Sequence, residues 1–296
     1  MEPTVLYNVP HEVPWKVYIP LYFYFTGLSA GSFILSSLST VFGIKKYKPL
    51  AFPAAIISFV LLLIAPVCLI VDLQQPFRFW HTLVPSFFNH KAVLSYGTWL
   101  LTIYPIANII YIWFIFVKDD RMMKIMGTIT VPLAVSVHAY TGFAFAVVRG
   151  RAWWHSALMP GYFLTSAILS GIALLVVVAF IMNIYSKKKL SEDVFSDLYN
   201  MMIAIIILDL FWVLSFWFTL LLSSTDGLAS IITAIHDPLY LWGELIFGML
   251  LPLFLLIFPV TRRSKVWVTL SAILVIGGVF LMRYSLVFIG FEIPLS

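Results

Sequence analysis

The chain has few charged residues and a single cysteine. Only 10% of its 296 residues are charged, whereas 62% are hydrophobic, and soluble domains carry about 25% charged residues. This composition excludes a soluble globular protein, because too little polar surface is present to face water, and it also excludes a disordered or fibrous chain. Cys68 lies in an apolar run. The chain therefore has no internal disulfide, and it lacks the roughly four thiolates that an iron–sulfur cluster needs.

Eight apolar stretches approach or exceed the roughly 20 residues that cross a bilayer as a helix. Backbone groups find no water partners in lipid, so helices are expected throughout. The sequence predicts an all-α integral membrane protein with no soluble domain. The first stretch is too long for the apolar part of a signal peptide, so we expect no cleavable one. The predicted spans are Tyr18–Gly43, Ala51–Val71, Val93–Val117, Met122–Val148, Ala157–Tyr185, Leu198–Leu222, Leu239–Val260 and Val266–Phe288.

The distribution of basic residues predicts the orientation. Eight spans place both termini on one side, and 12 of the 18 Lys and Arg residues fall on the opposite face. Short loops rich in Lys and Arg stay on the cytoplasmic side. We therefore expect a multi-pass protein of the plasma membrane with both termini outside. The net charge of +5 reflects these loops, so nucleic-acid binding is not expected.

The spans divide into two sets of four, residues 1–150 and 151–296 of a single membrane domain. The segments Phe25–Gly31 and Thr165–Gly171 are loosely alike, as a duplication would produce. Gly27 and Gly31 form a GxxxG pattern, which favours close packing of two helices. We expect two four-helix bundles.

Ionisable residues inside spans are costly and are functional candidates by default. They are Asp72, His138, Asp209, Glu244 and Arg283. Most lie in the outer half, which favours a site that an apolar-tailed substrate such as a quinone enters from the bilayer. A hydrogen bond between helices is a simpler explanation for each of these residues. For Arg283, a further explanation is that its long side chain extends to the membrane surface. A haem held by two histidines is not expected, because His138 is the one histidine within a span.

The outer loops are rich in aromatic residues and histidine. An interfacial aromatic belt would explain each residue alone, but together they are typical of a docking surface for an external protein. The candidate docking residues are Trp80, His81, Arg149, Trp153, Trp154 and His155.

Three segments carry a resemblance to a known family. They are Pro14–Gly31, Asp72–His81 and Tyr140–His155. Together they resemble the NrfD/polysulfide reductase membrane-subunit family along the whole chain, most strongly up to residue 171. The resemblance implies a haem-free, quinone-reactive anchor with eight spans. It also implies an external ferredoxin-like iron–sulfur subunit and, often, a molybdopterin oxidoreductase subunit.

The resemblance also implies roles for single residues. Tyr140 matches a tyrosine that contacts the quinone, and Asp72 matches an acidic residue of the family motif. Tyr22 stands where some members have a histidine on the first helix, a departure that weakens a quinone contact from that helix. His138 is the weaker candidate for the quinone, because it is two residues from Tyr140 and points about 200° away from it on a helix; a hydrogen bond across the bundle is the alternative. Arg78 is expected to hold Asp72 ionised or to help dock the partner.

The favoured interpretation is a membrane subunit that exchanges electrons between a quinone, expected to be of the menaquinone type, and an external iron–sulfur subunit. Terminal catalysis would lie on another polypeptide. Proton movement through Asp209 and Glu244 is a separate hypothesis. The alternatives are a secondary transporter with its site at those two residues, and a passive membrane anchor.

Overall fold

The computed structural model describes residues 15–73, 75–84, 89–90, 92–185, 190–223 and 225–292, and in this part of the chain the regular structure is entirely helical. Eight helical segments are long and apolar enough to cross a membrane, which confirms the predicted all-α membrane fold. These spans are α1 (Tyr18–Thr40), α2 (Lys48–Asp72), α3 (Val93–Val117), α4 (Asp120–Ala146), α5 (Met159–Tyr185), α6 (Glu192–Ser223), η4 (Leu239–Leu250) with α8 (Leu251–Ile257), and α10 (Lys265–Glu292).

Within the described residues, four short elements connect the spans, and the sequence pattern did not predict them. They are η1 (Lys45–Tyr47), η2 (Pro76–Leu83), α7 (Thr225–His236) and α9 (Pro259–Arg262). The seventh span begins as the π-helical segment η4 and ends at Ile257, three residues before the predicted end. The reason is Pro259: the residue before a proline is driven out of the helical region, and Phe258 has an extended ψ of 125°.

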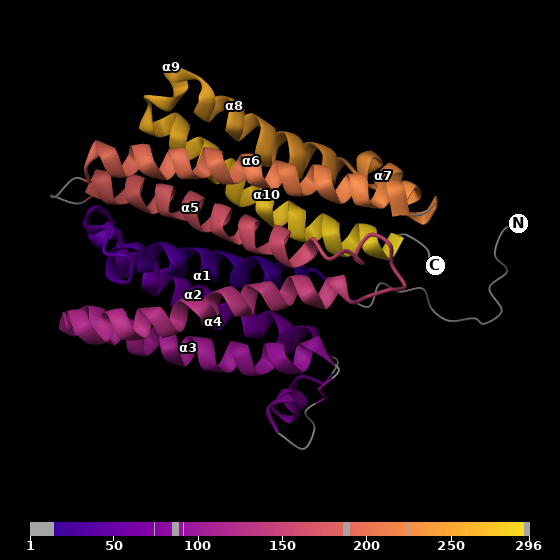
Figure 1. Ribbon diagram of the computed structural model, residues 1–296, viewed down its shortest axis with the longest axis horizontal. Coiled ribbons are helices and arrows are strands. Elements are labelled where there is room, and N and C mark those ends of the chain that lie inside the picture. Colours follow the sequence, from indigo (N-terminus) through magenta and orange to yellow (C-terminus); the bar gives the residue numbers. More distant parts are fainter. Residues whose placement is uncertain are drawn as a thin grey trace, which may run out of the picture.

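The spans run side by side, with α5 in the middle of the molecule (Figure 1). α1 packs against α2, α4 and α5, and α3 packs against α4. α10 packs against α5, η4 and α8. Because α5 contacts α1 and α4 as well as α6 and α10, the two halves meet along its length. The division into two four-helix bundles, with the boundary near residue 150, stays a prediction.

Glycines bring the two halves into close contact. The backbones of Gly31 on α1 and Gly171 on α5 lie so near each other that neither position has room for a Cβ atom. On the same face of α1, a Cβ on Gly27 would lie 3.0 Å from Cε1 of His138. The GxxxG pattern therefore does serve close helix packing, as predicted.

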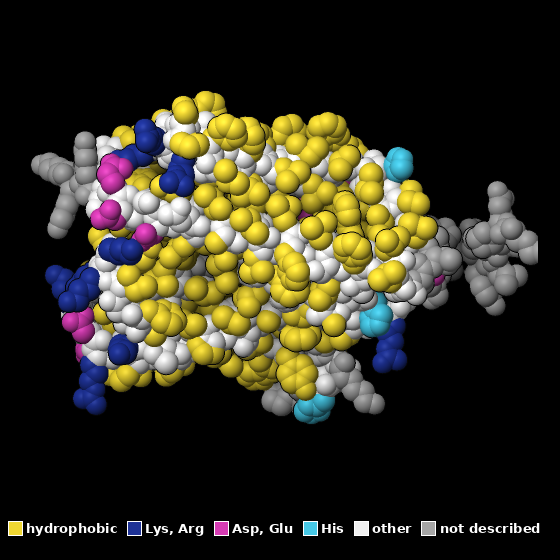
Figure 2. All heavy atoms as spheres, turned by 45° about the horizontal axis from the view of Figure 1, so that its top comes forward, with side chains coloured by type: hydrophobic (Ala, Val, Ile, Leu, Met, Phe, Trp, Pro, Cys, Tyr) yellow, Lys and Arg dark blue, Asp and Glu magenta, His cyan; other side chains and the backbone are white. Residues whose placement is uncertain are grey.

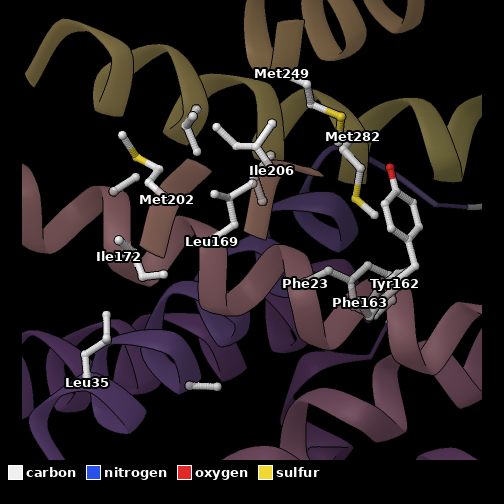
Figure 3. Close-up of a cluster of buried hydrophobic side chains, with 14 of the residues drawn as sticks. Phe23, Leu35, Tyr162, Phe163, Leu169, Ile172, Met202, Ile206, Met249 and Met282 are labelled. Carbon is white, nitrogen blue, oxygen red and sulfur yellow. The ribbon is translucent and has the colours of Figure 1, made fainter. Parts of the chain in front are cut away.

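Charge and apolar surface are segregated along the molecule. Hydrophobic side chains cover its middle, and Lys and Arg gather with acidic residues at one end (Figure 2). The described residues at this end form two ion pairs, Lys46 with Asp197 and Lys265 with Glu192. Inside, the core is continuous: Leu169 of α5 points toward Ile206 of α6 (Figure 3), and Ile172 and Met202 belong to the same buried cluster.

Candidate functional site

The centre of the buried polar site is Arg283 on α10. Its side chain is fully buried (0% exposed), so the expectation that it reaches the membrane surface is wrong. One guanidinium nitrogen, Nη2, donates to Ser166 Oγ at 2.6 Å and to the Phe163 carbonyl at 3.1 Å. The guanidinium carbon also lies 3.8 Å from the centre of the Phe163 ring. Burial of a cation requires such partners, and α5 supplies them.

His138 on α4 meets the same group. Its Nε2 is 3.0 Å from Arg283 Nη2 and 2.8 Å from the Phe163 carbonyl oxygen. Nε2 accepts from Arg283 in one tautomer and donates to Phe163 in the other, so the position of one proton decides which bond forms. Nδ1 is buried with no partner. The ring is therefore held by α5 and α10.

Glu244 on η4 lies in a second buried polar group, which it forms with tyrosine hydroxyls. Tyr162 on α5 donates to Glu244 Oε1 at 2.8 Å, and Trp217 Nε1 donates to Tyr240 OH at 2.8 Å. The Tyr162 ring stands between α5 and α10 with its hydroxyl toward Met282 (Figure 3). A cavity of about 10 Å³ beside Glu244 is lined by Trp153, Tyr162, Val213, Phe216, Tyr240, Glu244, Met282 and Leu286. This volume suits about one water molecule and is too small for a quinone ring.

Asp209 on α6 is fully buried, and neither of its carboxylate oxygens has a hydrogen-bond partner. Thr165 is close enough to interact with it, but the Thr165 hydroxyl donates to the carbonyls of Gly161 and Tyr162 instead. A hydroxyl has a single proton, so a rotation of Thr165 would transfer its bond to Asp209. Asp209 and Glu244 both lie within electrostatic range of the Arg283 guanidinium.

Tyr140 is separated from this group. Its ring packs on α3 over Gly97, where a Cβ atom would collide with it, whereas His138 faces α5 and α10. The two side chains thus point to different neighbours, as their spacing predicts. Tyr140 is 7% exposed, and no hydrogen bond from its hydroxyl is formed within the described residues.

The remaining candidates for the quinone site lie toward the same end of the first four helices. Asp72 ends α2, and its Oδ1 accepts from the backbone amide of Lys16 at 3.4 Å. Arg78 in η2 is exposed, and no ion pair joins it to Asp72 in the described structure. Tyr22 on α1 is buried, and its hydroxyl has no partner.

The candidate docking residues fall into two sets. Trp153 and Trp154 are only 1% and 3% exposed: Trp153 packs against Phe216 and Tyr240, and Trp154 donates to the Leu286 carbonyl at 2.8 Å. They are core residues of this protein and offer no free surface. The other four candidates are exposed or half-exposed, namely Trp80, His81, Arg149 and His155.

The Trp154 side chain belongs to an aromatic cluster at the end of the molecule where α1 begins and α10 ends. It stacks on Trp15 at 5.6 Å and meets Phe291 edge-on. Arg151 lies over Trp154 and Phe291, and its Nη1 donates to the Gly290 carbonyl. Partial burial lowers the pKa of the Arg151 guanidinium from its ordinary value. The cluster ties the segment before α1 to the loop after α4 and to the end of α10.

The sequence pattern missed the partners of the buried charges. Tyr162, Ser166 and Phe163 gave no signal, because tyrosine, serine and phenylalanine are common in membrane helices. The sequence indicates that Arg283 is an intramembrane charge, but it does not indicate the contacts that its guanidinium makes with α4 and α5. The described residues contain no group of three or more His, Cys, Asp or Glu side chains placed to hold a metal ion.

Comparison with known proteins agrees with the motifs. The family model described as "Polysulphide reductase, NrfD" matches residues 6–294. A selenate reductase subunit of Mesobacillus selenatarsenatis is 26% identical over 95% of this chain and 74% of its own length. The Hdr-like menaquinol oxidoreductase integral membrane subunit of Archaeoglobus fulgidus is 28% identical over 98% of this chain and 74% of its own length. A polysulfide reductase subunit of Wolinella succinogenes is 26% identical over 95% of both proteins. With its eight apolar spans, the chain belongs to the NrfD/polysulphide reductase family of integral membrane proteins.

Proposed function

We propose that this protein is the quinone-reactive membrane subunit of a respiratory oxidoreductase, with its quinone site at Tyr140 and Asp72. The observation that carries the site is the Tyr140 hydroxyl, which makes no hydrogen bond within the described residues although its ring is fixed against Gly97. The relative from Archaeoglobus fulgidus is named a menaquinol oxidoreductase subunit, which supports a menaquinone-type substrate.

The chemistry requires a hydrogen-bonding group and a proton acceptor. Oxidation of a quinol releases two electrons and two protons. The Tyr140 hydroxyl would bond one quinol oxygen, and the Asp72 carboxylate at the outer end of α2 would accept protons there. Tyr140 lies six residues before the end of α4, about 9 Å below it along the axis, so both groups lie toward one end of the molecule.

The electrons would pass to an external ferredoxin-like iron–sulfur subunit, and a molybdopterin oxidoreductase subunit would complete the complex. Relatives are named as parts of polysulfide and selenate reductases, which supports catalytic partner proteins. The exposed side chains of Trp80, Arg149 and His155 are the docking contacts that we propose, on the face where both termini lie outside the plasma membrane.

The test is quinol-dependent reduction of the partner clusters in the purified complex. Tyr140→Phe removes the hydroxyl and keeps the ring, and we expect the rate to fall about tenfold or more. Asp72→Asn should slow the reaction as well. Arg263→Gln, a change at an exposed residue of the opposite end, is the control. Rates equal to wild type in both site variants would remove this quinone site.

A second function, proton movement across the membrane, is favoured by the unpartnered oxygens of Asp209 and the bonded pair Tyr162–Glu244. A carboxylate without a fixed partner, next to a hydroxyl that can rotate, is suited to receive and pass on a proton. In proteoliposomes supplied with quinol and the complete complex, Asp209→Asn should lower the rate of proton movement much more than the rate of electron transfer. Wild type that moves no protons would end this proposal and leave the quinone site intact.

A further inference from the structure

An open groove lies on the surface of α4 near its N-terminal end. Its volume is about 450 Å³, and it is lined by Arg121, Lys124, Ile125, Thr128 and Ile129. These residues are spaced at i, i+3, i+4, i+7 and i+8, so they follow one face of the helix. The groove therefore runs along one continuous face of α4, and this face points away from the other helices.

The groove is charged at one end and apolar at the other. Arg121 lies in the first turn of α4, and Ile129 lies eight residues further on, about 12 Å deeper in the membrane. The side chains of Ile125 and Ile129 are 42% and 51% exposed. The Thr128 hydroxyl is between the two zones and donates to the carbonyl of Lys124. This order is the one found along a phospholipid, from phosphate to acyl chain.

The two cations of the groove are not neutralised by ion pairs within the protein. Elsewhere at this end, Lys46 and Lys265 are paired with Asp197 and Glu192. The described structure contains no ion pair from Arg121 or Lys124. Two acids are neighbours in the sequence. Asp119 caps α4, where its Oδ1 accepts from the Met122 amide at 3.0 Å, and Asp120 forms no ion pair with either cation in the described structure.

We propose that this groove binds an anionic phospholipid, with its phosphate between Arg121 and Lys124 and an acyl chain along Ile125 and Ile129. Basic residues at a membrane boundary attract anionic headgroups. A guanidinium bonds two phosphate oxygens at once, whereas an ammonium adds a point charge. The proposal uses only the surface of α4 and does not depend on the proposed function.

The experiment measures the lipid retained by the full-length protein purified in mild detergent, using native mass spectrometry with added phosphatidylglycerol or phosphatidylcholine. We expect wild type to retain phosphatidylglycerol preferentially. The double variant Arg121→Gln/Lys124→Gln should lose about tenfold or more of that affinity. The matched control, Arg262→Gln/Arg263→Gln, removes the same charge from two exposed residues of the same end. It should keep the affinity for phosphatidylglycerol.

A further variant separates a lipid from a free phosphate ion. Ile129→Trp keeps both cations but fills the apolar end of the groove, and it should also weaken phosphatidylglycerol retention. Inorganic phosphate at millimolar concentration should not displace the lipid. Equal retention by the Arg121/Lys124 variant and wild type, or an equal loss in the Arg262/Arg263 control, would overturn the proposal. Retention unaffected by Ile129→Trp would overturn the acyl-chain part of the site.

Discussion

At the scale of single residues, the strongest constraint in this protein is the burial of Arg283. Its guanidinium joins α10 to α5 through Ser166 and Phe163 and to α4 through His138. Nε and Nη1 have no partner, so the contacts that do exist must offset a large desolvation cost. Arg283 thus connects α10 and α5 to α4, the helix that carries Tyr140.

Removing this guanidinium should destabilise the fold. Arg283→Met keeps an unbranched side chain but loses the two protons that Nη2 shares among Ser166, Phe163 and His138. We expect a loss of about 2–4 kcal/mol of stability, measured as a lower melting temperature of the purified protein in detergent. Arg78→Gln, at an exposed position, should change stability by less than about 0.5 kcal/mol. A melting temperature of Arg283→Met equal to wild type would contradict the structural role assigned to Arg283.

The contact between Gly97 and Tyr140 gives a test of the quinone site that leaves the tyrosine in place. A Cβ on Gly97 would collide with the Tyr140 ring, so Gly97→Ala should displace that ring and lower quinol oxidation about tenfold or more. Gly277→Ala is the matched control, because no atom beyond its chain neighbours and its own helix backbone lies within 4 Å of its added Cβ. Full activity of Gly97→Ala in the quinol assay would argue against a role for Tyr140.

At the scale of elements, the sequence predicts the membrane spans, but it does not predict where each helix begins or the short helices between spans. Hydropathy over about 20 residues identifies a membrane helix, because lipid leaves the backbone no other solution. The start of α6 at Glu192 was missed by six residues, since its first turns carry charges outside the apolar stretch. α7, with 12 residues, is too short to register as a span. The quinone candidates came from motifs, whereas the bonds of Arg283 depend on tertiary contacts that no local pattern encodes.

The crossing of α1 and α5 should be highly sensitive to added volume. The backbones meet at Gly31 and Gly171, so a methyl group cannot be accommodated by turning a side chain. We expect Gly31→Ala to cost about 1–3 kcal/mol, seen as a lower melting temperature in detergent. Gly277→Ala should instead be neutral or slightly stabilising, because alanine is the better helix former. Equal melting temperatures of the two variants would show that the helices separate freely.

At the scale of the whole molecule, the two ends differ in chemistry. One end holds the Lys and Arg clusters with their ion pairs, and the opposite end carries histidines (Figure 2). α1 begins and α10 ends at the latter end (Figure 1). The positive-inside rule then predicts that the basic end is cytoplasmic. This orientation decides which compartment would receive the protons of the proposed quinol oxidation and from which side the proposed electron-accepting partner would approach.

The orientation can be tested with single cysteines in intact cells. Cys68, which is buried on α2, is the single cysteine of the chain. A Cys68→Ala background therefore contains no other thiol. His236→Cys replaces an exposed residue at the end of α7, and Arg263→Cys replaces an exposed one at the opposite end. A membrane-impermeant maleimide should label His236→Cys in intact cells and label Arg263→Cys only after permeabilisation. His236 lies outside the proposed docking surface, so a bound partner should not shield it. The reverse labelling pattern would place both termini in the cytoplasm and move the proposed quinone site to the other leaflet.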